Sequence, residues 1–265
     1  ATIASVSTAS ANASETFSVD GSGGIGAFSG SSTVSGGYLH LTEAVTSQSG
    51  FWYYNPTKAL TAFHATFSLR VGGGTSADGC WFGYAPQDNS GLEGGTTGLY
   101  IVFDSYDNGS ETTPDISVKY NNGTYADVRR DFRGDVFKDV SVTVSTDGLC
   151  TVVHDSVPIV VDLPLTGWSP QAAWRFGFAA FTGGSDDRHY VDNFAVVDNV
   201  HTVTLNSLGG LGRLRMNLNA ATVQDKYGAN IMPNTFTSGQ EYVFDFVSPT
   251  VTINKAASQS DPAAT

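Results

Sequence analysis

The stretch Ala65-Thr66-Phe67-Ser68-Leu69-Arg70-Val71 decides the fold class, because apolar and polar residues alternate along it with period two. That period is typical of a β-strand with one buried face and differs from the period of an amphipathic helix. The same alternation recurs in Tyr38–Thr42 and Val140–Ser145, and tight-turn signals stand at Asn122-Gly123 and Asp147-Gly148. Many short strands separated by such turns predict an all-β sandwich or jelly roll.

The composition agrees with this prediction and excludes several partners. The 265 residues include 30 glycines and 12% aromatic residues, but only 14% are charged. Lys and Arg total 13 against 25 Asp and Glu, and the resulting net charge of −12 argues against nucleic acid, which binds clustered positive charge. No apolar run approaches the roughly 20 residues of a membrane helix. We therefore predict no nucleic-acid partner and no membrane insertion.

The sequence changes character after its first three quarters, which predicts more than one structural unit. We expect a sandwich over residues 1–198, a small β segment over 199–250, and a linker or the start of a further repeat over 251–265. Within the second unit, Gly209–Leu218 and Val223–Asn230 resemble part of the immunoglobulin-like repeats of large bacterial surface proteins. About 50 residues is small for an independent core. The segment is therefore expected to lean on the sandwich or to be half a domain, with an extension of the sandwich sheet as the alternative.

Several segments follow, in the right order, the sequence pattern of the L-type, legume-lectin-like domains. The resemblance implies an all-β, concanavalin A-like jelly-roll sandwich with a small C-terminal β appendage. It also implies a sugar-binding module that depends on calcium. The segments that carry the resemblance are Gly37–Thr42, Gly50–Tyr54, Phe63–Leu69, Ala77–Pro86, Gly98–Asn108 and Phe176–Gly184.

The resemblance assigns Ca²⁺ to the loop that begins at Asp104. Calcium takes six to eight oxygen ligands from carboxylates, amides and carbonyls. Asp104 and Asn108 are expected to offer side-chain oxygens, and Tyr106 its main-chain carbonyl. The remaining carboxylate ligand stays open, and its candidates are Glu111, Asp115 and Asp127.

The resemblance also places a sugar beside this loop. Asp78 is expected to accept hydrogen bonds from two neighbouring sugar hydroxyls, and the Asn108 amide to donate one. Gly94 or Gly95 would add a main-chain N–H, and the ring of Tyr106 would stack on a sugar face. Selection of the sugar is assigned to the last loop, with Gly184, Ser185, Asp186, Asp187 and His189.

Two rival functions compete with sugar binding. Glycosidases and polysaccharide lyases share the sandwich, but the Glu-x-Asp-x-x-Glu spacing of the sandwich hydrolases does not occur in this sequence. Because a retaining glycosidase needs two carboxylates about 5 Å apart, we predict that the chain is not an enzyme. The alternative is a structural spacer, or a domain of a surface protein that binds a ligand other than sugar.

Two smaller features allow two interpretations each. Cys80 and Cys150 either form a disulfide or are two buried free thiols. Arg133-Gly134-Asp135 is an integrin-type tripeptide, but turn chemistry before a strand explains it better. Taken together, the sequence predicts a calcium-dependent lectin module of a large extracellular bacterial adhesin. Its expected partners are glycans or polysaccharide on a cell surface and further domains of the same chain, and its expected location is outside the cell or on the cell surface.

Overall fold

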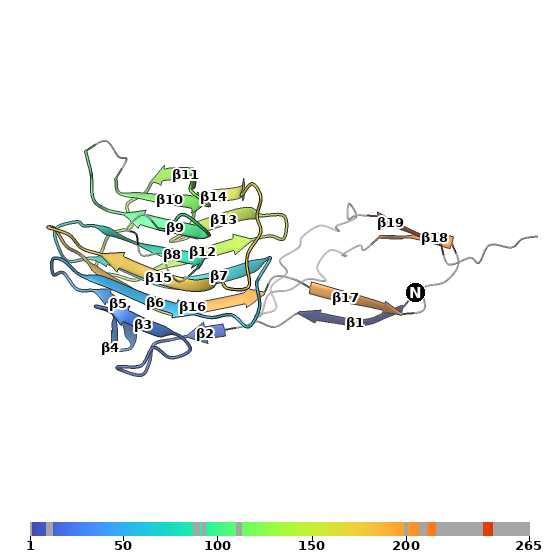
Figure 1. The fold of residues 1–265 in the computed structure, drawn as a ribbon, viewed down its shortest axis with the longest axis horizontal. Helices are drawn as coiled ribbons and strands as arrows, with labels where there is room; N and C mark the ends of the chain where they lie inside the picture. The colour runs from blue at the N-terminus through green and yellow to red at the C-terminus, as the bar shows by residue number, and fades with distance from the viewer. Residues whose placement is uncertain are drawn as a thin grey trace, which may run out of the picture. The chain divides into compact units, whose positions relative to one another are not determined.

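Two antiparallel sheets form a sandwich in the computed structural model of the chain (Figure 1). The described part contains no helix long and apolar enough to cross a membrane. The two sheets confirm the prediction of an all-β sandwich. The structure describes residues 2–8, 13–86, 91, 94–109, 113–198, 201–206, 211–215 and 241–245.

The first sheet has seven strands, and the predicted site residues Asp104 and Asp115 lie at the ends of two of them. Each strand pairs antiparallel with its neighbour. In spatial order the strands are β11 (Gly123–Arg129), β10 (Asp115–Tyr120), β9 (Leu99–Asp104), β8 (Gly79–Ala85), β15 (Arg175–Phe181), β6 (Ser49–Tyr54) and β3 (Ala27–Gly30).

The second sheet has eight strands, of which one, β2 (Ala13–Glu15), pairs with β16 off the main path. The stretch that opened the sequence argument lies in β7, at the centre of this sheet. The other strands, in spatial order, are β14 (Val157–Pro164), β13 (Leu149–His154), β12 (Lys138–Val144), β7 (Phe63–Gly72), β16 (Arg188–Asp198), β5 (Tyr38–Thr42) and β4 (Thr33–Ser35).

Aromatic rings fill the space between the sheets. Phe67 of β7 meets Phe82 and Phe178 of the opposite sheet at centroid distances of 5.1 and 4.9 Å. Trp52 of β6 meets Phe194 of β16 at 5.3 Å in an edge-to-face arrangement, which is a favoured geometry for aromatic pairs. The alternation along β7 therefore directs its apolar side chains into one core shared by the two sheets.

The chain divides into two compact units, and the division differs from the predicted boundary. The sandwich comprises residues 7–202, whereas residues 1–6 belong with residues 203–265. The reason is a pairing that local sequence does not reveal, because β1 (Thr2–Thr8) is hydrogen-bonded to β17 (His201–Asn206).

In the second unit, β18 (Leu211–Arg215) pairs antiparallel with β19 (Glu241–Asp245). The predicted Val223–Asn230 motif and residues 251–265 lie outside the described residues.

The two cysteines are free thiols, which settles the question left open by the sequence. Cys80 lies on β8 and Cys150 on β13, so the two residues belong to different sheets. Both are buried, and burial raises the pKa of the Cys150 thiol to about 12. Each therefore serves as a small apolar core residue.

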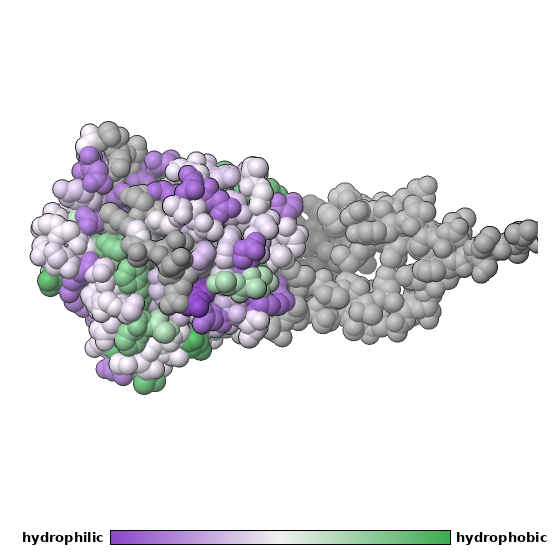
Figure 2. Space-filling view, viewed as in Figure 1, coloured by the Kyte–Doolittle hydropathy of each residue, from purple (hydrophilic) through white to green (hydrophobic). Residues whose placement is uncertain are grey.

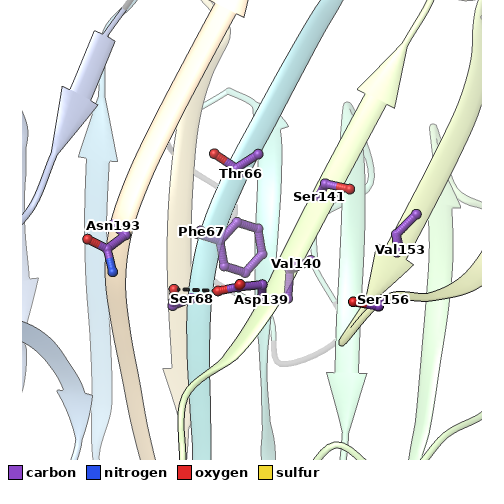
Figure 3. A pocket seen from close by; sticks show the side chains of 9 residues that line it. All are labelled: Thr66, Phe67, Ser68, Asp139, Val140, Ser141, Val153, Ser156 and Asn193. Atoms are coloured by element: carbon purple, nitrogen blue, oxygen red, sulfur yellow. Dashed lines mark hydrogen bonds between the residues drawn. The ribbon is translucent and has the colours of Figure 1, made fainter. Parts of the chain in front are cut away.

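The outer face of the eight-stranded sheet carries a groove of about 360 Å³ with a mixed polar and apolar lining (Figure 3). Ser68 donates a hydrogen bond to Asp139 there at 2.8 Å, and Asn193 contributes from the neighbouring strand β16. None of the predicted site residues lines this groove. On the face that Figure 2 shows, apolar residues form small separate patches among polar ones.

Candidate functional site

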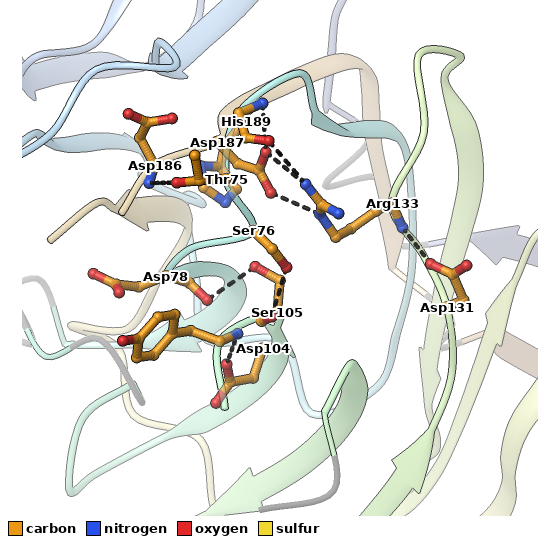
Figure 4. A network of polar contacts seen from close by, with 12 residues as sticks. Thr75, Ser76, Asp78, Asp104, Ser105, Asp131, Arg133, Asp186, Asp187 and His189 are labelled. Atoms are coloured by element: carbon orange, nitrogen blue, oxygen red, sulfur yellow. Dashed lines mark hydrogen bonds and ion pairs between the residues drawn. The ribbon is translucent and has the colours of Figure 1, made fainter. Parts of the chain in front are cut away.

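Three loops that are distant in the sequence are tied together by hydrogen bonds (Figure 4). The main-chain N–H of Ser105 donates to the carbonyl of Asp78 at 3.1 Å, and the Ser76 hydroxyl donates to the carbonyl of Ser105 at 2.9 Å. The main-chain N–H of Thr75 donates to the carbonyl of Asp186 at 2.7 Å. The loop that follows β7 is therefore the common support of the other two.

Asp78 lies against the last loop. Its main-chain N–H donates to the carbonyl of Phe181 at 3.0 Å, and a Cβ added to Gly183 would lie 3.0 Å from its Oδ2 atom. The Ala77–Asp78 peptide bond is cis. The side chain is half-buried, and burial raises the pKa of its carboxyl. A carboxylate in this position is available to accept hydrogen bonds at the surface.

Asp104 and Asp115 form a pair of neighbouring carboxylates. They are directly opposite each other in the β9–β10 register, and their exposed fractions are only 8% and 6%. Like charges directly opposite on adjacent strands destabilise a sheet unless positive charge compensates them. Arg129 is the register partner of Asp115 on its other side. A cation bound by both carboxylates would reduce their mutual repulsion further.

The residues around Asp104 offer oxygen donors of the kinds that calcium takes. The main-chain N–H of Tyr106 donates to Asp104 Oδ1 at 2.9 Å, which fixes the start of the loop that ends with Asn108. In the described ranges no three side chains of His, Cys, Asp or Glu gather into a metal cluster. Calcium also accepts neutral carbonyl and amide oxygens. It would thus be held by Asp104, Asp115, the Tyr106 carbonyl and the Asn108 side chain.

The register ranks the carboxylates that the sequence left open, and it does not place Asp127 opposite Asp104 or Asp115. Asp127 is exposed on β11 and lies opposite Ser117, not opposite Asp115. It is two strands away from Asp104, a separation of roughly 10 Å, whereas calcium–oxygen bonds are only about 2.4 Å long. Asp115 is the residue that the structure brings to Asp104. Glu111 lies outside the described residues.

The last loop is held at its C-terminal end by a buried ion pair. Asp187 is completely buried, and its two carboxylate oxygens lie 2.8 and 3.0 Å from Nε and Nη2 of Arg133 (Figure 4). The main-chain N–H of Gly74 also donates to Asp187 at 2.9 Å. This contact occupies the arginine of the Arg-Gly-Asp tripeptide within the fold, which agrees with the structural interpretation of that motif.

The N-terminal end of the same loop is held by Thr182. Its hydroxyl donates to the carbonyl of Val45 at 2.7 Å, and its main-chain N–H donates to the carbonyl of Gln48 at 2.9 Å. Between the two anchors, Gly184 is exposed with open space around it, and Ser185 is half-buried. The structure therefore presents Gly184 and Ser185 on a short segment fixed at both ends.

Gly95 belongs to a segment that folds back over the seven-stranded sheet. Gly91 accepts a hydrogen bond from the indole N–H of Trp81 at 3.0 Å, and Gly94 packs against the ring of Tyr100. Gly95 itself is half-buried. The hydrogen bond therefore ties this segment to Trp81, two residues after the start of β8 at Gly79.

His189 does not lie where the sequence analysis placed it, and its assignment as a sugar contact is wrong. The residue is completely buried, with Nδ1 2.7 Å from the Thr42 hydroxyl. The physical reason is strand alternation, because His189 shares the inward face of β16 with Val191, whereas Tyr190 lies on the other face.

Acidification below pH 6.5 is expected to destabilise the fold through His189. Burial lowers the pKa of this imidazole to about 4. Between pH 6.5 and 4 the unfolded chain therefore binds a proton that the folded chain does not, so stability falls as the pH falls. The contribution is about 2 kcal/mol between pH 7 and pH 5. Urea titrations at both pH values measure the free energy of unfolding. His189→Asn should reduce the difference between the two values by about that amount. An unchanged difference would show that His189 is not the group responsible.

The comparisons with known proteins place this architecture in the class of lectin-type sandwiches. The model of the legume-like lectin family matches residues 21–149. This part of the chain is thus similar to the legume-like lectin family. The solved structures share its fold, so the concanavalin A-like sandwich expected from the resemblance is confirmed. A search of curated proteins finds no match.

Solved structures with the same fold include two lectin domains bound to sugar. The VIP36 exoplasmic/lumenal domain, in its form bound to Ca²⁺ and Man3GlcNAc, is 22% identical with a TM-score of 0.55, over 66% of this chain and 84% of that one. The lectin UEA-II complexed with galactose is 19% identical with a TM-score of 0.57, over 71% and 98%. The potassium-bound carbohydrate recognition domain of Emp46p is 15% identical with a TM-score of 0.54, over 67% and 90%.

Proposed function

We propose that the chain is a calcium-dependent carbohydrate-binding module. The observation that carries the proposal is the hydrogen-bonded link between Asp78 and the loop that begins at the Asp104–Asp115 pair. Asp78 stands beside Gly183 in the last loop, and its carbonyl accepts hydrogen bonds from both the N–H and the hydroxyl of Ser105 at 3.1 Å. Ser105 directly follows Asp104 of the carboxylate pair. An ion held by that pair would therefore order the loop that supports Asp78.

The chemistry of these groups suits a polyhydroxylated ligand better than a reaction. A surface carboxylate accepts hydrogen bonds from two neighbouring hydroxyls, and the ring of Tyr106, which is 39% exposed, can stack on an apolar sugar face. The solved structures with this fold include forms bound to Man3GlcNAc and to galactose, which supports a sugar ligand without choosing among sugars. We accordingly propose binding, and not catalysis, as the activity.

We further propose that the module acts in a large extracellular bacterial adhesin. Its partners would be glycans or polysaccharide on a cell surface, together with further domains of the same chain. The support is the resemblance of Gly209–Leu218 to immunoglobulin-like surface repeats and the acidic, lysine-poor composition. Tethered modules of this kind gain avidity when several weak sites engage together.

A glycan array probed in calcium, and again after treatment with EDTA, tests the function. A signal that requires calcium is expected from the natural chain. Gly183→Ala should weaken that signal at least tenfold, because the new Cβ would lie 3.0 Å from Asp78 Oδ2 and displace the carboxylate. Ser141→Ala is the control, since Ser141 lines the groove on the other sheet, where none of the predicted site residues lies.

The expected pattern is binding that Gly183→Ala lowers and Ser141→Ala preserves. An array that stays blank in calcium would overturn the proposed function. Binding that survives EDTA would overturn the role of calcium. Equal loss in the two variants would show that Asp78 is not the group that meets the sugar.

A further inference from the structure

A row of aromatic side chains lies on the outer face of the seven-stranded sheet, separate from the core. Phe181 of β15 and Phe51 of β6 have their ring centroids 5.5 Å apart, and Phe51 and Tyr53 are 6.3 Å apart. All three side chains are half-buried, and they pack against a cluster formed by Trp81 and Tyr100 on the same face. Aromatic rings are thus partly exposed on a sheet face that a purely structural surface would make polar.

The sheet leaves room for the Phe51 and Tyr53 rings, whereas the Phe181 ring is inclined by 82° to that of Phe51. Tyr53 is opposite Gly177 in the β6–β15 register, and a Cβ added to Gly177 would lie 2.6 Å from the Tyr53 ring. Phe51 is opposite Ala179, another small residue. The Phe51 and Tyr53 rings are inclined by only 10° to each other. Small residues on β15 therefore make room for two nearly parallel rings on β6.

The row begins at the candidate sugar site. Phe181 accepts the main-chain hydrogen bond of Asp78 at 3.0 Å, and it is followed directly by Thr182 and Gly183 of the last loop. A sugar chain whose first unit bonds to Asp78 would therefore have Phe181 next to it, then Phe51, then Tyr53. Phe51 and Tyr53, 6.3 Å apart and nearly parallel, can present their faces to successive units of one chain. Phe181, whose ring is nearly perpendicular to that of Phe51, would contact the unit before them.

We propose that this aromatic row, Phe181, Phe51 and Tyr53, binds the sugar units beyond the first, so that the natural ligand is an oligosaccharide chain. The apolar C–H faces of pyranose rings stack on aromatic rings, and this contact needs no particular pattern of hydroxyls. The row would make affinity rise with the number of sugar units in the chain, while the loops around Asp78 select the first sugar. The proposal rests on the proposed function of the same site.

Titration calorimetry on the full chain in calcium tests the row with three matched series: mannose, galactose and glucose, each as the monosaccharide, disaccharide and pentasaccharide. In the series that binds, affinity should rise at least tenfold from monosaccharide to pentasaccharide. Phe51→Leu and Tyr53→Leu, which keep apolar volume and remove the ring, should each lower pentasaccharide affinity roughly fivefold and leave monosaccharide affinity unchanged. Phe137→Leu is the control, because Phe137 is also half-buried but packs against Tyr38 and Arg70.

The outcomes separate the two proposals. Equal affinity for monosaccharide and pentasaccharide would overturn the aromatic row and leave the proposed function standing. Loss of monosaccharide affinity in the leucine variants would also overturn it, because the rings would then serve the first sugar or the fold. Absence of binding in all three series would overturn the proposed function, and the inference with it.

Discussion

Replacing Arg133 by methionine should lower the free energy of unfolding of the sandwich by roughly 3–5 kcal/mol. The substitution leaves the carboxylate of Asp187, which is completely buried, without its charged partner. Uncompensated buried charge is among the costliest defects a fold can carry. For a unit of this size the thermal midpoint should fall by about 10 °C, as followed by circular dichroism.

Two further variants isolate the cause of this loss. Arg188→Met removes an exposed arginine from β16 and should change the midpoint little, because exposed charges contribute little to stability. Arg133→Met combined with Asp187→Leu should recover much of the loss, since neither charge then remains inside. A midpoint for Arg133→Met close to that of Arg188→Met would show that the ion pair does not stabilise the fold.

Calcium in hundredfold excess over its Kd should stabilise the sandwich by about 2.7 kcal/mol, which raises the thermal midpoint by several degrees. Asp104→Asn and Asp115→Asn should each abolish this rise, because each removes one of the two facing carboxylates. In calcium-free buffer the same substitutions should stabilise the fold slightly, because they remove like charges directly opposite each other. Differential scanning calorimetry with calcium and with EDTA measures both effects.

Asp127→Asn is the matched control for the calcium prediction. It removes the same charge from a residue that is exposed and opposite Ser117, so the calcium-dependent rise should persist. A midpoint that is the same in calcium and EDTA for the natural chain would argue against a calcium site at Asp104. Loss of the rise in Asp127→Asn would return that residue to the ligand set.

The fold class could be predicted because apolar and polar residues alternate along a strand that has one buried face. The pattern over Ala65–Val71 predicts a strand with one buried face, and β7 has that form. The pairing of β1 with β17 could not be predicted from the sequence. It joins segments nearly two hundred residues apart, and periodicity within a strand carries no information about so distant a partner.

Family resemblance supplied part of the candidate site, and the rest depends on strand register, which the sequence does not reveal. Asp78 and the loop after Asp104 came from the resemblance, whereas choosing between Asp115 and Asp127 required knowing which residues face each other. Arg133 was missed as a support because its partner, Asp187, is 54 residues away. His189 was misplaced, although its even spacing from Val191 in β16 was a usable sign of an inward side chain.

The pairing of β1 with β17 makes the sandwich an insertion between two strands that hold each other. In a tethered chain under mechanical load, tension entering on both sides of this pair would stretch its hydrogen bonds first. The strands of the sandwich would bear force only after β1 and β17 separate.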